Sequence, residues 1–392
     1  MSGLFAALML RRQGWEVDVY ERVEGELAGR GAGIVAQPEI RRAFEMLGID
    51  FGETLGVSTV DRRTFDREGC LLAKSECPQI HTTWERVYRL LRAAIPPERY
   101  HRGMRLTHVE QPPEGVVAHF DDGSSAQGDL LVGADGLRST VRTQYLPDLA
   151  PIYAGYVAWR AMIDEGVMSP KTHSEIYLCM AFCLPEHEQM LGYPVAGAND
   201  DLRPGHRRYN LVWYRPTDER RLEWMLTDES GVTHVGSIPP PLIHKSVIAE
   251  MRTEAVRVLS PQFQEVIALA PEPFLQPIYD FETPQMAFGR IAILGDAAFV
   301  ARPHVGAGVA KGADDAIALA RALGSGLPIE AALKQFETER LVVGRRIVQR
   351  ARELGAYMQA ERATEAERAA AERHHGPEPT MAETALLDFL YE

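Results

Sequence analysis

Three short segments, widely spaced along the chain, are predicted to be strands that stop at an acidic residue. The first alternates apolar and polar residues up to Glu21, and the other two are continuous apolar runs that end near Asp135 and Asp296. A continuous apolar run is typical of a strand buried in a parallel sheet between helices. Each segment also lies next to a predicted helix. We therefore expect an α/β chain that leaves its sheet and regains α/β character near residue 290.

The opening of the chain fits part of a dinucleotide-binding βαβ unit. A helix is predicted from Gly3 to a cap at Gly14, and the strand to Glu21 follows. In such a unit the acid that ends the second strand hydrogen-bonds a ribose hydroxyl, and Gly3 would be the last glycine of G-x-G-x-x-G. The preceding strand and the first two glycines would then lie upstream of Met1, so we expect the natural protein to begin earlier. Taken alone, Glu21 could equally well be a strand-end acid that faces water.

Composition narrows the class of protein. The 392 residues, a quarter of them charged, suffice for two or three domains. A net charge of -13, with no dense basic run, argues against nucleic acid or an anionic membrane as partner. Four cysteines without a Cys-x-x-Cys pair indicate reduced thiols and a cytoplasmic protein. The apolar start lacks a basic leader and a cleavage site, and no later segment has the length of a membrane span.

The predicted elements divide the chain into four parts. An α/β domain is split by an aromatic- and proline-rich segment with several strand-like runs, which we expect to form the substrate domain. The last part is helical, and His374–His375 near its end has tail-like surroundings, so no metal ligand is expected. The parts are residues 1–150 (first α/β part, with 60–100 contributing to the substrate side), 151–280 (substrate domain), 281–328 (returning α/β part) and 329–392 (C-terminal helices and tail).

The order of the motifs resembles one known family. The ribose-type Glu21 is followed by Gly-Ala-Asp-Gly at residues 133–136, by Gly-Asp-Ala-Ala at 295–298, and by Pro-His-Val-Gly-Ala-Gly at 303–308. This series is similar to the fingerprint of the class A FAD-dependent aromatic monooxygenases, and the likeness covers nearly the whole chain. A narrower likeness to the bacterial 2,6-dihydroxypyridine 3-monooxygenase group lies in residues 153–160, 192–197, 210–214 and 302–304.

The resemblance implies both a fold and an activity. The fold would be of the α/β class, with a three-layer Rossmann-like FAD-binding domain, an inserted mixed α+β substrate domain and a C-terminal helical segment. The activity would be hydroxylation of a small hydroxylated aromatic or N-heteroaromatic compound, with FAD as cofactor, NADPH or NADH as reductant, and O₂ activated as a flavin C4a-hydroperoxide. The expected partners are the small aromatic substrate and O₂, with a homodimer as the candidate assembly.

The resemblance also implies cofactor contacts. Glu21 would hold the adenosine ribose and Asp296 the ribityl chain, while the backbone from Pro303 to Val309 would pass along the isoalloxazine edge into a helix N-terminus. Asp135 belongs to a motif linked to FAD and to reduced nicotinamide, and Gly33 to a glycine-rich loop that starts at Gly31. The full set of expected FAD-binding residues is Gly3, Glu21, Arg22, Gly33, Leu106, Asp135, Gly136, Asp296, Pro303, Gly306, Ala307, Gly308 and Val309.

One helix departs from the family pattern. Where the class has an arginine three residues before a leucine, on the helix that faces the flavin, this chain has Trp84 and Val87. Arg86 or Arg89 could take the place of that arginine. Trp84 is expected to pack against other side chains and not to contact the flavin.

The expected catalytic residues are His304, Tyr156 and Arg160. His304 could orient or deprotonate a ring hydroxyl, since imidazole titrates near neutrality, or it could simply bond to the backbone of a tight loop. Arg160 could bind an anionic ring oxygen or pair with an acid between domains. Tyr156, Trp159 and Tyr193 could line an aromatic pocket, although aromatic side chains on strands more often belong to the core.

Two alternatives stay open from the residues alone. A flavin-dependent reductase or dehydrogenase has the same fold, since fold and cofactor do not fix the reaction. A truncated relic without FAD, or a ligand-binding protein, would follow if the glycines that cradle the pyrophosphate were absent.

Overall fold

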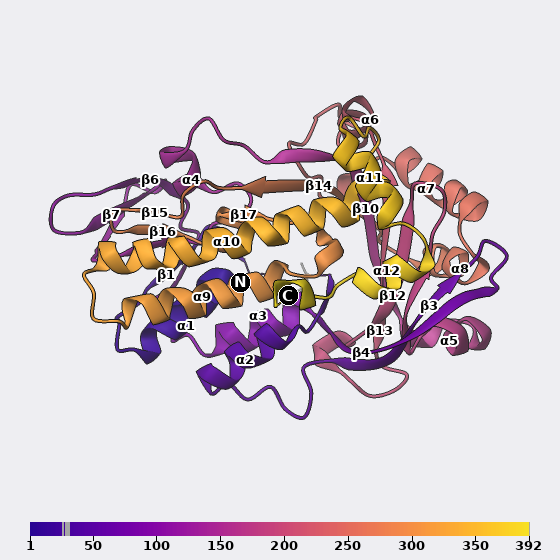
Figure 1. Cartoon of the computed structure of the whole chain (residues 1–392), viewed down its shortest axis with the longest axis horizontal. Helices are drawn as coiled ribbons and strands as arrows, with labels where there is room; N and C mark the ends of the chain where they lie inside the picture. Colours follow the sequence, from indigo (N-terminus) through magenta and orange to yellow (C-terminus); the bar gives the residue numbers. More distant parts are fainter. Residues whose placement is uncertain (26, 28–31, 392) are drawn as a thin grey trace.

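The computed structural model describes residues 1–25, 27 and 32–391, which form an α/β body and a large mixed sheet with helices of its own (Figure 1). The α/β body combines segments from both ends of the sequence. Its first part contains α1 (Ser2–Arg12), β1 (Val19–Glu21), α2 (Pro38–Leu47), α3 (Trp84–Ala93), β5 (Tyr100–Arg102), β6 (Leu106–Glu110), β7 (Val116–Phe120), β8 (Ser125–Gly128), β9 (Leu131–Gly133) and α4 (Thr140–Tyr145). Its second part contains β15 (Ala287–Phe288), β16 (Ile291–Ile293), α9 (Gly308–Leu323) and α10 (Ile329–Gly355).

The expected return of the chain to its α/β body is confirmed. β16 pairs in parallel with β9, with Ile291 opposite Leu131, and β15 adds an antiparallel strand on the outer edge. β1 pairs in parallel with β5, while β6, β7 and β8 form an antiparallel meander. Among the described strands, β1 and β9 each have a single ladder partner. α1 lies against both of them, so a buried helix joins the two short parallel ladders.

The first turn of α1 packs closely against glycines of the returning part. A Cβ placed on Gly312 of α9 would lie 2.2 Å from Ser2 Oγ and 3.0 Å from Ser2 Cβ. A Cβ on Gly295, which follows β16, would also lie 2.2 Å from Ser2 Oγ. Ser2 therefore occupies the space that side chains at these positions would need. This packing fixes the start of α1 beside the end of β16 and the first turns of α9.

The expected substrate side is built on a nine-stranded sheet with the order β17-β14-β10-β13-β12-β11-β3-β4-β2. Its strands are β2 (Gly33–Val35), β3 (Val57–Phe65), β4 (Leu71–Thr83), β10 (Ile152–Asp164), β11 (Cys179–Cys183), β12 (Gln189–Val195), β13 (Arg208–Pro216), β14 (Phe274–Glu282) and β17 (Phe299–Val300). The helices that accompany it are α5 (Pro170–Ile176), α6 (Glu219–Met225), α7 (Lys245–Val258) and α8 (Pro261–Leu269).

The two faces of this sheet have different partners, because side chains alternate along each strand. On β10, Tyr156 and Ala158 belong to a buried cluster that includes residues of the C-terminal segment. Trp159 lies in a second cluster, with residues of α7 and α8. The favoured interpretation of Trp159 as a core side chain is therefore confirmed, since the period of two places it on the face opposite to Tyr156.

α10 connects the two halves of the molecule. It packs on α9 and β15 at one end and on β14 towards the other, and it runs from the α/β body to the large sheet in Figure 1. No described helix, α10 included, is long and apolar enough to cross a membrane. The domain limits expected near residues 150, 280 and 328 stay a prediction.

The residues after α10 contradict the expected tail-like surroundings of His374–His375. Two further helices follow, α11 (Glu365–Arg373) and α12 (Pro377–Glu383). α11 is mostly exposed, as expected for a solvated helix, but α12 packs on β3 and β4. Met381, Ala385 and Leu387 are buried, and Arg62 donates a hydrogen bond to the backbone oxygen of Met381. Burial of these apolar side chains, which are scattered in a polar sequence, holds the C-terminal segment on the sheet.

We predict that Gly312→Ala destabilises the protein by about 1–3 kcal/mol, because the new Cβ would overlap Ser2 in a packed contact. Gly308→Ala in the same helix is the matched control. No atom lies within 4 Å of a Cβ placed there, so the FAD-free stability should stay equal or rise slightly. Urea unfolding of both FAD-free variants measures the difference. Equal stability of Gly312→Ala and the wild type would contradict the packing of α1 described above.

Candidate active site

The end of β16 and the start of α9 form a polar rim around Asp296. Lys311 Nζ lies 3.8 Å from Asp296 Oδ1 and 3.9 Å from Asp315 Oδ2. Asp315 already accepts hydrogen bonds from Gly295 N and Arg340 Nε. Lys311 has a side chain only 1% exposed, whereas that of Asp296 is 53% exposed, and Lys311 Nζ has no hydrogen-bond partner among the described residues. A buried ammonium group without a hydrogen bond favours an anionic or polar ligand at this rim.

Two helix N-termini face the same region without side-chain caps. Neither Met1, at the start of α1, nor Ala307, at the start of α9, forms a capping hydrogen bond through its side chain. Burial lowers the pKa of the Met1 amino group, and the nearby carboxylates of Glu21 and Asp296 act in the opposite direction. Both expected ribose and ribityl acids are therefore close to the start of α1. Uncapped N–H groups at helix N-termini are suited to bind phosphate.

Asp135 has a structural role that is visible directly. Its Oδ2 accepts hydrogen bonds from Thr140 N at 2.7 Å and from Val141 N at 3.3 Å, and so it caps α4. Gly136 beside it adopts φ +78° and has open space around its Cβ position. A contact of Asp135 or Gly136 with FAD stays a prediction.

The remaining expected FAD-binding residues are spread over several elements. Arg22 is exposed after β1, and Leu106 is half-buried at the start of β6. Gly33 lies in β2, where its N–H donates to Asn210 Oδ1 at 2.9 Å. Gly3 lies in the first turn of α1. Gly31 of the glycine-rich loop falls outside the described residues.

The loop expected to follow the flavin is anchored by a buried ion pair. Arg302 Nε donates to Asp280 Oδ2 at 2.8 Å, and Arg302 Nη1 donates to Gln359 Oε1 at 2.8 Å. Asp280 Oδ1 also accepts from Arg352 Nη2 at 2.8 Å. Strand β14, helix α10 and the residue just before Pro303 are thereby joined through one carboxylate. The loop that begins at Pro303 therefore starts from a residue, Arg302, whose position is fixed by these contacts.

Two of the expected catalytic residues form a direct hydrogen bond. Tyr156 Oη lies 2.8 Å from His304 Nε2, and both side chains are buried. His304 Nδ1 is also buried but has no hydrogen-bond partner among the described residues. Burial, with Arg302 and Arg160 nearby, lowers the pKa of His304 to about 3, so its imidazole is neutral at pH 7. A neutral imidazole with one free nitrogen can orient or accept the proton of a ligand hydroxyl.

Arg160 lies in the same group of aromatic side chains. Burial raises the pKa of Tyr214 to about 12, and Arg160 opposes this shift through its charge and a hydrogen bond. Arg160 also lowers the pKa of His304 and, against the larger effect of burial, that of Tyr193. Its Nε atom is buried without a hydrogen-bond partner in the described part of the chain. The alternative of an ion pair with an acid between domains finds no support among the described ion pairs.

His81 joins this cluster and was missed from the sequence. Its ring stacks on Tyr193, with centroids 4.4 Å apart, and its Nε2 lies 3.0 Å from Thr59 Oγ1. Burial, with the charge of Arg62, lowers the pKa of His81 to about 3. The segment around His81 shows only a polar strand pattern, so nothing in the sequence connects it to Tyr193. Lys311 was missed too, although a single lysine among the alanines and glycines of α9 could have indicated a buried functional charge.

The C-terminal segment covers the loop that contains His304. Ala385 N donates to His304 O at 2.7 Å, while Ala385 O accepts from Gln37 Nε2 and Gln79 Nε2, each at 3.0 Å. Gly306, at φ +61°, leaves room for this contact, because a Cβ there would lie 2.9 Å from Ala385 Cβ. The segment therefore closes one side of the cluster with apolar side chains and satisfied backbone groups.

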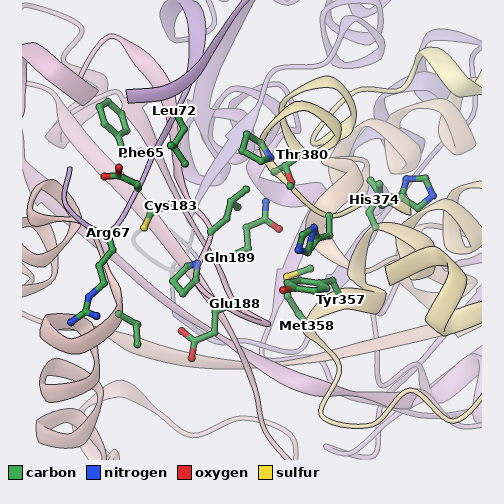
Figure 2. Close-up of a pocket in the computed structure, with 18 residues that line it drawn as sticks. Phe65, Arg67, Leu72, Cys183, Glu188, Gln189, Tyr357, Met358, His374 and Thr380 are labelled. Carbon is green, nitrogen blue, oxygen red and sulfur yellow. The ribbon is translucent and has the colours of Figure 1, made fainter. Parts of the chain in front are cut away.

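A cavity lies beside the same segment. A cavity of about 280 Å³ is bordered by Gln189 of β12, by Tyr357 and Met358 after α10, and by His374 and Thr380 of the C-terminal segment (Figure 2). Met381, next to Thr380, belongs to the cluster around Tyr156. α12 thus borders both the cavity and the cluster.

The arginines proposed to replace the family's flavin-side arginine have other partners. Arg89 Nη2 lies 2.7 Å from Asp200 Oδ2 and Arg86 Nη1 lies 3.5 Å from it, while Arg86 also donates to two backbone oxygens. Trp84 stacks on Tyr88 with ring centroids 5.2 Å apart. The expected packing of Trp84 is therefore observed, whereas both arginines connect α3 to the substrate side through Asp200.

We predict that His304→Gln makes stability less sensitive to acid. The pKa of His304 is lowered from 6.5 to about 3, so the unfolded chain binds a proton that the folded chain excludes. Stability present above pH 6.5 is therefore lost as the pH falls towards 3, at up to about 1.4 kcal/mol per pH unit for one histidine. Urea unfolding at pH 7.5, 5.5 and 4.5 should give a smaller loss for the variant. The exposed His206→Gln serves as control, and an unchanged loss in His304→Gln would contradict a neutral buried imidazole.

Comparisons with known proteins agree with this geometry. The family described as "FAD binding domain-like" matches residues 153–280, and the one described as "FAD binding domain" matches residues 274–351. The chain is 30% identical over 364 residues to 2,6-dihydroxypyridine 3-monooxygenase of Paenarthrobacter nicotinovorans, covering 92% of this chain and 89% of that protein. It is 28% identical to 6-hydroxynicotinate 3-monooxygenase of Bordetella bronchiseptica, over 82% of this chain and 80% of the relative.

A solved structure extends the likeness to the fold. The structure of 2,6-dihydroxypyridine-3-hydroxylase from Arthrobacter nicotinovorans superposes with a TM-score of 0.86 at 29% identity, covering 93% of each chain. The α/β fold expected from the motif order is thereby confirmed. The relatives support an FAD-dependent hydroxylase and not the reductase or relic alternatives. The chain is a member of the class A FAD-dependent monooxygenase family.

Proposed function

We propose that this enzyme hydroxylates a small hydroxylated aromatic or N-heteroaromatic ring similar to 2,6-dihydroxypyridine. In the overall reaction one oxygen atom of O₂ enters a ring C–H bond, the other leaves as water, and NADPH or NADH supplies the two electrons. The observation that carries the proposal is the buried cluster of Tyr156, His304 and Arg160, in which two polar atoms lack partners. The names of the relatives, which act on dihydroxypyridine and hydroxynicotinate, support this substrate class.

The residues present fit FAD. Lys311 offers a buried ammonium without a hydrogen-bond partner among the described residues, and the exposed carboxylate of Asp296 and the uncapped start of α9 add an acceptor and backbone donors beside it. Gly308 leaves open space beside that helix start, where a cofactor can approach the backbone. Bound there, FAD would supply the activation of O₂ that ring hydroxylation requires.

His304 would manage the proton of a ring hydroxyl. Its Nε2 is engaged by Tyr156, so Nδ1 is the nitrogen left without a partner, and a ring hydroxyl would supply the partner that this buried atom lacks. Removing or loosening that proton pushes electron density onto the ring and makes its carbons more nucleophilic. Arg160 would hold the resulting negative oxygen, because a guanidinium stays charged and donates hydrogen bonds in a fixed fork.

The C-terminal segment would keep water away from this chemistry. The backbone contacts of Ala385 with His304, Gln37 and Gln79 close the loop side of the cluster. Water exclusion strengthens the interaction of Arg160 with an anionic oxygen and prevents loss of the activated oxidant.

The proposal also includes the location of the enzyme, its reductant and its assembly. A cytoplasmic location is supported by free thiols at Cys70, Cys77, Cys179 and Cys183. NADPH or NADH as reductant and assembly as a homodimer stay predictions, as does the absence of a nucleic-acid partner, which the net charge of -13 favours.

The direct test begins with loading the purified chain with FAD. Binding should give a yellow protein, and 2,6-dihydroxypyridine should stimulate NADH or NADPH oxidation with formation of one hydroxylated product per reductant consumed. Turnover under anaerobic conditions with a hydride acceptor, and no hydroxylated product in air, would favour the reductase alternative. A protein that stays colourless would contradict the cofactor assignment.

We predict that Gly308→Ala weakens FAD binding, because the added methyl group occupies the open space beside the start of α9. The loss should be at least about tenfold in Kd, measured by flavin fluorescence, if one backbone contact is blocked. The FAD-free protein should remain as stable as the wild type. Unchanged FAD affinity would place the cofactor elsewhere.

We predict that Arg160→Gln lowers kcat/KM for a dihydroxypyridine by roughly 10- to 100-fold, the loss expected for one charge-assisted hydrogen bond. The matched control is Arg208→Gln at the exposed end of β13, which should leave kcat/KM unchanged. Steady-state kinetics with product quantification measures both. Equal kinetics in the two variants would remove Arg160 from the substrate site.

A further inference from the structure

We propose that His108, Glu110 and His119 form a binding site for a divalent transition-metal ion, with Zn²⁺ as the best-matched cation. The three residues lie on the β6–β7 hairpin of the α/β body, away from the cluster of Tyr156 and His304. Their donor atoms all lie within 4.8 Å of one another. Two imidazole nitrogens and a carboxylate oxygen are a ligand set that suits Zn²⁺ and related cations.

The pairing of the two strands brings the ligands together. His108 and His119 are direct partners across the antiparallel ladder, and Glu110 lies two residues after His108 on the same face. The imidazole rings are stacked, with centroids 4.2 Å apart and planes within 2° of parallel. The ladder therefore holds the three side chains close together on one face of the hairpin, and rotation of the rings out of their stack would let both Nε2 lone pairs point at one ion.

The distances suit a metal better than hydrogen bonds. Glu110 Oε1 lies 3.7 Å from His108 Nε2, and Glu110 Oε2 lies 3.6 Å from His119 Nε2. Both separations are too long for a hydrogen bond. A tetrahedral Zn²⁺ with bonds of about 2.1 Å separates its ligand atoms by about 3.4 Å. Small rotations of Glu110, which is exposed, would bring its oxygen into range.

The hydrogen bonds around His108 favour the tautomer that a metal needs. Thr107 Oγ1 donates its single proton to the backbone oxygen of His119 at 2.9 Å. The contact of 3.1 Å between Thr107 Oγ1 and His108 Nδ1 must then be a bond donated by Nδ1–H. His108 Nε2, which faces Glu110, therefore carries the lone pair. A second residue that fixes the ring in this way is typical of metal-binding histidines.

His119 supplies an independent sign of a missing ligand. Its Nε2 is shielded from solvent and has no hydrogen-bond partner among the described residues. A cation bound by Glu110 and His108 would satisfy this atom, and water would complete four-coordination on the exposed side. Next to His119, Phe120 stacks on Tyr20 of β1, with centroids 4.8 Å apart. An ion that clamps β6 to β7 would thus also brace the strand that ends at Glu21.

The test is a titration of the purified full-length chain with ZnCl₂ by isothermal calorimetry. Wild-type protein should bind one Zn²⁺. In His119→Ala and in Glu110→Gln the affinity for this ion should fall on the order of a hundredfold. Thr107→Val keeps all three ligands but removes the hydroxyl that fixes His108, and should weaken binding by at least about tenfold. Exposed His206→Ala is the control and should bind Zn²⁺ like the wild type.

Thermal unfolding adds a readout that does not depend on activity. Zn²⁺ should raise the Tm of the wild type and of His206→Ala but not that of His119→Ala, since binding to the folded state alone stabilises it. Equal Zn²⁺ binding by the wild type and His119→Ala would overturn the proposal. So would a Zn²⁺ affinity of Thr107→Val equal to that of the wild type, together with a wild-type Tm that Zn²⁺ does not raise.

Discussion

The buried ion pair between Arg302 and Asp280 is the contact on which the arrangement of the active site depends. Asp280 also accepts hydrogen bonds from Arg352, and Arg302 also donates to Gln359, so strand β14, helix α10 and the loop that follows Arg302 meet at one carboxylate. Removing one partner of such a pair leaves a buried charge uncompensated, typically at a cost of about 3–5 kcal/mol. The position of His304 follows from this anchor, because it lies two residues after Arg302.

From that anchor the site is assembled by elements that share no local sequence. The loop brings His304 to Tyr156 of β10, the sheet brings Arg160 to Tyr193 and Tyr214, and the C-terminal segment covers the loop through Ala385. Three of the buried polar atoms that lack partners among the described residues belong to the candidate site: His304 Nδ1, Arg160 Nε and Lys311 Nζ. In a packed interior such atoms are costly, so each of the three marks a place where a ligand would supply the missing partner.

Sequence reasoning found the residues whose signal is local. Glu21, Asp135 and Asp296 lie at or just after the ends of strands, as expected, and two of them are near the start of α1, while their contacts with FAD stay a prediction. For Trp159 sequence reasoning favoured the core over the aromatic pocket, and the core is where the side chain lies. The positions of His81 and Lys311 in the site, and the packing of the C-terminal segment over the His304 loop, were missed, since each depends on contacts between segments far apart in the chain. The same holds for His108 and His119, whose pairing is set by hairpin register.

By itself, the sequence determined the α/β class, the order of the cofactor motifs and the family, because hydrophobic periodicity and glycine placement are local consequences of backbone geometry. Only the tertiary structure decided which polar side chains meet, which remain unsatisfied, and where the C-terminal residues pack. These outcomes depend on strand register, on alternation across the nine-stranded sheet and on burial, which are properties of long-range packing. A sequence pattern indicates that a side chain is buried, but which residues it contacts is determined by the tertiary packing of the whole chain.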